Sequence, residues 1–115
     1  MLCIIIHEES MPIAITQENA DQIKKSTKPV IVDVYAVWCG PCQMMAPIFE
    51  ELEQELGAQY LFAKLNVDEA RELSIQFGVS SVPTFLFIKN GTIVGKEVGS
   101  MNKEDLEDKI TQYLG

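Results

Sequence analysis

Trp38-Cys39-Gly40-Pro41-Cys42 is the stretch of this sequence that decides the fold and the chemistry. Two cysteines at this spacing can lie on one turn of a helix and close a small, reversible disulfide ring. If Cys39 begins the helix, unpaired backbone N–H groups and the positive end of the helix dipole face its sulfur. Both favour the thiolate, the form that attacks disulfides. Pro41 fits the first helical turn, so we predict a redox-active dithiol at a helix start.

Strand and helix patterns alternate around this motif. Residues 30–35 are β-branched and apolar and lead straight into it, and the helix that it opens is expected to end at Gly57. Asn90-Gly91 lies between two apolar runs and is a strong hairpin signal. The expected strands cover residues 12–15, 30–35, 60–67, 84–88 and 93–98. The expected helices cover residues 16–26 and 40–56, a short segment capped by Asp68, and a last segment capped by Asn102. This order predicts a mixed, mostly parallel sheet with helices on both faces.

The chain resembles the thioredoxin family in an ordered set of motifs that begins near Val30 and runs toward the C-terminus. The residues that carry the resemblance are Val32-Asp33, Trp38-Cys39-Gly40-Pro41-Cys42, Ala46-Pro47, Lys64-Leu65-Asn66-Val67-Asp68, Val82-Pro83-Thr84, Asn90-Gly91 and Val98-Gly99. The resemblance implies the thioredoxin fold, an α/β fold with a central mixed four- to five-stranded sheet flanked by helices on both faces. The length of 115 residues predicts a single domain over residues 1–115.

The N-terminal residues have no settled place in this alignment. Residues 1–11 can be an extension ahead of the family's first strand. Alternatively, residues 2–6 form an added strand or the first strand itself, and Met11 could be the biological start. For Cys3, a buried inert thiol is the default interpretation, and a regulatory disulfide is the alternative.

The two cysteines are expected to act in sequence. Cys39 attacks a client disulfide, and Cys42, one turn further in and more shielded, resolves the mixed disulfide. Gly40 and Pro41 offer no side chain that would stabilise the thiolate, so the pair favours the reductive type of the family over isomerases or oxidants. The alternative is half of a zinc site. It would need Cys3 and His7, which on one strand lie too far apart, at about 3.3 Å per residue, to share a metal. We therefore expect no metal.

Asp33 is a carboxylate within an otherwise apolar strand. If the sheet is covered on both faces, burial should raise its pKa toward neutrality and suit it to proton transfer. The resemblance implies that Asp33 serves Cys42, through a water, and that Lys64 lies close and modulates its charge. The alternatives are a carboxylate at a sheet edge and an exposed lysine.

The resemblance also implies a client-binding surface around the sulfurs. The Val82–Pro83 bond is expected to be cis, leaving the Val82 backbone free for an extended client segment; an ordinary trans proline is the alternative. Trp38 is expected to be exposed rather than in the core. The implied apolar patch consists of Trp38, Gly40, Pro41, Val67, Val82, Pro83, Gly99 and Ser100.

Composition excludes several classes of protein. Seventeen acidic and nine basic residues give a net charge of −8, which argues against nucleic acids and anionic membranes as partners. The apolar segments are too short to span a bilayer, and the N-terminus is a poor signal peptide. Three cysteines do not make a disulfide framework, so a cytoplasmic, reducing setting fits best.

The resemblance implies a redox carrier without a bound cofactor, recharged by a flavin- and NADPH-dependent thioredoxin reductase. Its implied clients are proteins such as peroxiredoxins, methionine sulfoxide reductases and ribonucleotide reductase, and we expect a monomer. Two rival functions remain open: a binding module that does not need its cysteines, and a reductase with one dedicated client. Gln43 departs from the family by removing a frequent positive charge after Cys42.

Overall fold

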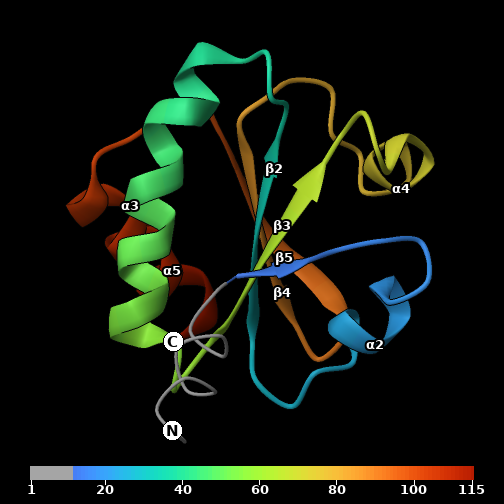
Figure 1. Ribbon diagram of the computed structural model, residues 1–115. Helices are drawn as coiled ribbons and strands as arrows, with labels where there is room; N and C mark the ends of the chain where they lie inside the picture. The colour runs from blue at the N-terminus through green and yellow to red at the C-terminus, as the bar shows by residue number, and fades with distance from the viewer. Residues whose placement is uncertain (1–11) are drawn as a thin grey trace, which may run out of the picture.

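The computed structural model describes residues 12–115 and has one five-stranded sheet with helices on both faces (Figure 1). The strand order is β1-β3-β2-β4-β5. The first three strands in this order pair in parallel, whereas β2–β4 and β4–β5 are antiparallel. The expected mixed α/β fold is therefore confirmed, but the sheet is not mostly parallel, because two of its strand pairs are parallel and two are antiparallel. The predictions for Cys3, His7 and the rest of residues 1–11 lie outside the described residues.

Most predicted elements are present, with some shifted bounds. The strands are β1 (Ile13–Ala14), β2 (Val30–Tyr35), β3 (Leu61–Asn66), β4 (Thr84–Lys89) and β5 (Thr92–Val98). The helices are α2 (Ala20–Lys24), α3 (Gly40–Leu56), α4 (Arg71–Gln76) and α5 (Lys103–Leu114). Asn102 caps α5 as predicted, since its side chain accepts a hydrogen bond from the Asp105 N–H.

Two predicted helix starts are wrong. α2 begins at Ala20, not just after Thr16, because Thr16 and Asn19 exchange side-chain-to-backbone hydrogen bonds and hold the intervening residues in a turn. α4 is preceded by Ala70, not capped by Asp68. The carboxylate of Asp68 instead accepts a hydrogen bond from the indole N–H of Trp38, so it does not cap the helix.

The alternation of side chains along β2 divides the interior into two cores. Val30, Val32 and Val34 pack on one side with residues of α2 and α4. Ile31 packs on the other side, where α3 and α5 supply Met45, Phe49, Leu52, Leu106, Ile110 and Leu114. Figure 1 shows α3 and α5 on one side of the sheet and α2 and α4 on the other. Asp33 follows Ile31 by two residues, so it points toward α3.

The hairpin between β4 and β5 closes as the sequence predicts. Asn90 has a φ of 55° and Gly91 a φ of 80°, the left-handed values that a tight two-residue hairpin turn requires. Among residues 12–115, no helix is long and apolar enough to cross a membrane.

Candidate active site

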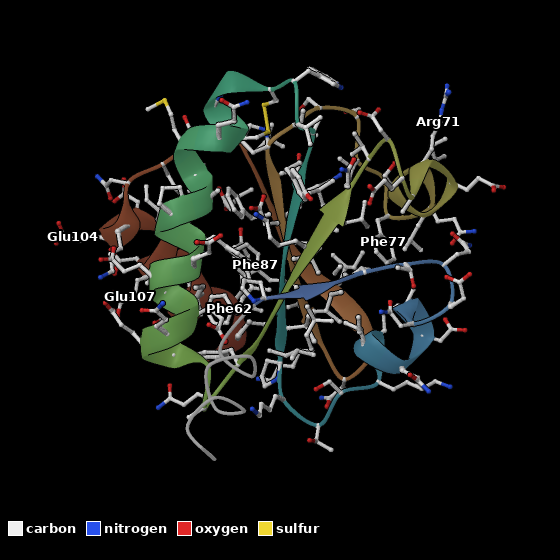
Figure 2. All side chains as sticks on the ribbon, viewed as in Figure 1. Phe62, Arg71, Phe77, Phe87, Glu104 and Glu107 are labelled. Carbon is white, nitrogen blue, oxygen red and sulfur yellow. A yellow bond between two sulfur atoms is a disulfide. The ribbon has the colours of Figure 1, made fainter. Side chains whose placement is uncertain are left out.

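A disulfide joins Cys39 and Cys42 at the start of α3, where the sulfurs are drawn in yellow in Figure 2. Cys39 is the N-cap of α3, and its sulfur accepts a hydrogen bond from the Cys42 N–H at 3.2 Å. Pro41 lies in the first helical turn and needs no hydrogen-bond partner there. The predicted helix start is confirmed: an otherwise unpaired helix N–H is directed at the Cys39 sulfur.

Both cysteines are buried. Cys42 is 3% exposed, as predicted, whereas Cys39 is only 6% exposed although its place at the helix end predicts an accessible sulfur. Val67, directly after β3, and Val82, in the loop before β4, pack against the two cysteines. The Cys39 sulfur lies 3.9 Å from the Val82 carbonyl oxygen. An incoming disulfide must therefore displace or slide along these apolar side chains to reach the sulfur.

Asp33 lies in β2, on the face of the sheet that α3 covers. It is 1% exposed, and within residues 12–115 neither carboxylate oxygen has a hydrogen-bond partner. Burial raises the pKa of this carboxyl from 3.8 to about 6, and the nearby Lys64 partly opposes that rise. The predicted buried carboxyl with a raised pKa is confirmed. At neutral pH this group is poised to gain or lose a proton.

Lys64 is paired with Asp33 across the β2–β3 ladder and points to the same face of the sheet. Its ammonium lies 4.7 Å from the centroid of the Tyr35 ring, a cation–π geometry. Lys64 and Cys42 both line a cavity of about 200 Å³. Its lining is Tyr35, Ala36, Val37, Cys42, Gln43, Ala46 and Lys64. This cavity gives the enclosed side of Cys42 room for a water molecule.

The loop before β4 lies against the disulfide. The Val82–Pro83 peptide bond is cis, as the resemblance implied, and Pro83 is buried. The Gly99 N–H donates a hydrogen bond to the Pro83 carbonyl at 2.9 Å. Gly99 has a φ of 103°, a conformation that a residue with a side chain rarely adopts. The end of β5 is thereby fixed to the loop that covers Cys39.

Trp38 is exposed, as predicted, at 69%. Its indole N–H donates a 2.9 Å hydrogen bond to the Asp68 carboxylate, which links the motif to the segment after β3. This pairing between residues far apart in the sequence holds a large apolar ring in solvent beside Cys39. It also accounts for the failure of Asp68 to cap α4.

A cleft of about 550 Å³ opens beside the dithiol. We refer to it as the client cleft; its lining is Trp38, Val67, Asp68, Arg71, Ser74, Ile75, Val79, Ser80, Ser81 and Val82. Of the predicted patch, only Trp38, Val67 and Val82 line it. Gly40, Pro41 and Ser100 are exposed outside it, and Pro83 and Gly99, which are joined by a backbone hydrogen bond, are not part of its lining.

Sequence reasoning missed the polar side of this cleft, which α4 and the following loop supply. Arg71, Ser80 and Ser81 carry no motif, so the only available signal was that the loop runs directly into the predicted Pro83. Among residues 12–115 no group of three or more His, Cys, Asp or Glu side chains is arranged to hold a metal ion.

Comparisons with known proteins agree with this geometry. The family model described as Thioredoxin matches residues 11–112. A thioredoxin of Alicyclobacillus acidocaldarius is 42% identical over 102 residues, which are 89% of this chain and 97% of that protein. Thioredoxin H4 of Arabidopsis thaliana is 45% identical over 95 residues, which are 83% of this chain and 79% of that protein.

A solved structure shows the same likeness in three dimensions. A mutant thioredoxin from Halobacterium salinarum superposes with a TM-score of 0.84 at 33% identity, covering 93% of this chain and 94% of that one.

Proposed function

The chain belongs to the thioredoxin family and is a thiol–disulfide oxidoreductase with protein-disulfide reductase activity, and from this premise we propose how its residues divide the reaction. One observation carries the proposal. The Cys39–Cys42 disulfide lies at the start of α3, with a helix N–H directed at the Cys39 sulfur. That arrangement favours a thiolate at Cys39 once the disulfide is reduced.

The reaction proceeds in two exchanges. The Cys39 thiolate attacks one sulfur of a client disulfide; a mixed disulfide forms, the client bond breaks, and the second client sulfur leaves and takes a proton from solvent. The Cys42 thiolate then attacks the Cys39 sulfur. The Cys39–Cys42 bond forms, the mixed disulfide breaks, and the first client sulfur leaves. Two electrons have passed from the dithiol to the client.

Asp33 accepts the Cys42 proton, through a water, before the second exchange. Its pKa of about 6 and its position on the α3 face of the sheet support this role. Lys64 acts through Asp33 and not on the sulfurs. Its positive charge opposes the rise in the Asp33 pKa and keeps the carboxylate available as a base near neutral pH.

The client segment binds in extended form along the Val82 backbone, beside the Cys39 sulfur. The exposed Trp38 ring and the enclosing Val67 and Val82 side chains support this role. We assign client binding to Trp38, Gly40, Pro41, Val67, Val82, Pro83, Gly99 and Ser100. Backbone and general apolarity, more than particular side chains, would then select most clients.

The family works with thioredoxin reductase and with disulfide-containing proteins. For this chain we propose recharging by a flavin- and NADPH-dependent thioredoxin reductase. Its clients would be of the kind represented by peroxiredoxins, methionine sulfoxide reductases and ribonucleotide reductase. We also propose a monomer acting in the cytoplasm without a bound cofactor. We further propose a single thioredoxin domain over residues 1–115, with residues 1–11 as an N-terminal extension; the family model matches residues 11–112.

The test is reduction of insulin disulfides with NADPH and a thioredoxin reductase, followed by NADPH absorbance. The native chain should turn over, and Cys39→Ser should not. Cys42→Ser should instead accumulate mixed disulfides at Cys39 with many proteins of a cell extract. Insulin reduction by Cys39→Ser at the native rate would contradict the assignment, and a single adduct would indicate one dedicated client.

A further inference from the structure

The polar side of the client cleft has no part in the two exchanges. Arg71 at the start of α4, with Ser80 and Ser81 in the following loop, faces the same cleft as Trp38 and Val82. Figure 2 shows Arg71 extending outward from α4 into solvent. A client segment seated along Val82 therefore lies in a cleft that Arg71 helps to line, and the Arg71 side chain is exposed to solvent.

The Arg71 guanidinium is available to a partner. Within residues 12–115 it makes no ion pair or hydrogen bond. Several other cations are already engaged: Lys96 bonds the Gly78 carbonyl, Lys103 pairs with two glutamates, and Lys109 pairs with Glu97. Arg71 is also the single arginine of the chain, and a guanidinium matches a carboxylate better than an ammonium does.

The cleft lining also includes one carboxylate. Asp68 lines the cleft together with Arg71, but one of its oxygens accepts the Trp38 indole N–H at 2.9 Å. The cleft is therefore polarised, with a negative group anchored at the Trp38 wall and an unpaired positive group on α4. An acidic client side chain is repelled at the first and attracted at the second.

We propose that Arg71 is a specificity-determining residue, and that the client cleft prefers segments with a Glu or Asp side chain on the α4 side of the reactive cysteine. The preference rests on the proposed function, because only a client of the Cys39 exchange occupies the cleft. It is local, since the net charge of −8 repels acidic proteins in general. Arg71 binds a carboxylate and takes no part in the transfer of electrons.

The experiment uses the whole chain, reduced beforehand, and disulfide-linked synthetic peptides of one neutral sequence. Each peptide carries Glu, Gln or Lys two residues before or after its cysteine. The second-order rate of peptide thiol release is measured by acid quench and chromatography, without any reductase. With the residue on one side of the cysteine, Glu should react about two- to fivefold faster than Gln, the size expected of an exposed ion pair.

Three variants separate Arg71 from overall charge. Arg71→Gln should bring the Glu-to-Gln rate ratio to about one, whereas Arg71→Lys should keep part of it. Lys89→Gln removes the same unit of charge at the exposed end of β4 in the hairpin, away from the cleft, and should leave the ratio unchanged. The native ratio should also fall in high salt.

The outcomes are distinct. A native Glu-to-Gln ratio of one or less, or a ratio that survives Arg71→Gln, overturns the inference about Arg71 while leaving the reductase assignment intact. Failure of the native chain to reduce the Gln peptide at all would contradict the proposed function instead.

Discussion

Two buried carboxyl groups, Asp33 in β2 and Glu53 in α3, share the same physical signature in different parts of the molecule. Asp33 is 1% exposed and Glu53 8%, and each has a buried oxygen without a hydrogen-bond partner within residues 12–115. Burial raises the pKa of both, and a lysine opposes the rise in both: Lys64 for Asp33 and Lys28 for Glu53. A perturbed carboxyl is thus not by itself a functional group.

Position separates the two groups. Asp33 lies in β2, the strand that leads to Cys39, on the face of the sheet that α3 covers. Glu53 lies more than two turns further along the same helix, near Gly57, whose carbonyl Lys28 bonds. We therefore interpret Asp33 as a proton acceptor for the dithiol and Glu53 as a structural residue.

The largest difference is expected in the rate of client reduction. Asp33→Asn removes the proton acceptor of Cys42 and should slow the second exchange about a hundredfold at pH 7. Glu53→Gln, the matched change, should stay within about twofold of native. The measurement is single-turnover breakdown of the mixed disulfide, which releases the client thiol that had been bound to Cys39. Equal losses in the two variants would show that Asp33 has no special role.

The second difference is in stability. Because the folded pKa of Asp33 is raised, its folded state binds more protons than the unfolded chain between pH 3.8 and about 6. The stability associated with the protonated carboxyl is complete below pH 3.8 and is lost as pH rises through about 6.

Asp33→Asn should therefore raise the free energy of unfolding at pH 7 by up to about 3 kcal/mol, and by little at pH 3.5. Glu53→Gln should act in the same direction but less, since Glu53 is more exposed. Urea unfolding of the oxidised proteins at both pH values measures this. A loss of stability at pH 7 in Asp33→Asn would contradict the raised pKa.

The third difference is in the pH dependence of the reaction. The second exchange should fall about tenfold per pH unit below pH 6, because protonated Asp33 cannot accept the Cys42 proton. Glu53→Gln should keep this acid limb and Asp33→Asn should lose it. Stopped reactions between pH 4.5 and 8 would show the limb; its presence in Asp33→Asn would assign it to another group.

The smallest effect should come from the lysines. Lys64→Gln removes the charge that opposes burial, so the Asp33 pKa should rise and the acid limb should move to higher pH. Lys28→Gln should raise the Glu53 pKa and leave the limb in place. NMR titration of the two carboxyl carbons distinguishes the changes. If Lys28→Gln also shifted the acid limb of the pH–rate profile, the reaction would depend on Glu53 as well, which would contradict the distinction between the two carboxyl groups.

The same pair of residues shows what the sequence could predict. Asp33 was identifiable because it interrupts an apolar strand, and a strand that is apolar on both faces leaves a carboxylate no solvent-exposed side of the sheet. Glu53 was not, because α3 is rich in glutamate and its pattern does not say which glutamate turns inward. The motif and Gly57 fixed both ends of α3 correctly.

What escaped prediction depends on contacts between distant segments. The start of α4 was misplaced because Asp68 bonds Trp38, thirty positions away, rather than its own helix. The enclosure of Cys39 by Val67 and Val82, and the place of Arg71 in the client cleft, arise only when three separate segments meet. Local sequence patterns do not indicate which distant segments come into contact in the folded chain.

The hydrogen bond between Trp38 and Asp68 has a practical consequence. The chain contains one tryptophan, and it directly precedes the reactive disulfide. All indole fluorescence therefore originates at a ring held next to the Cys39–Cys42 pair in the sequence. We expect its intensity to differ between the disulfide and the dithiol, so that emission would follow the oxidation state without an attached dye.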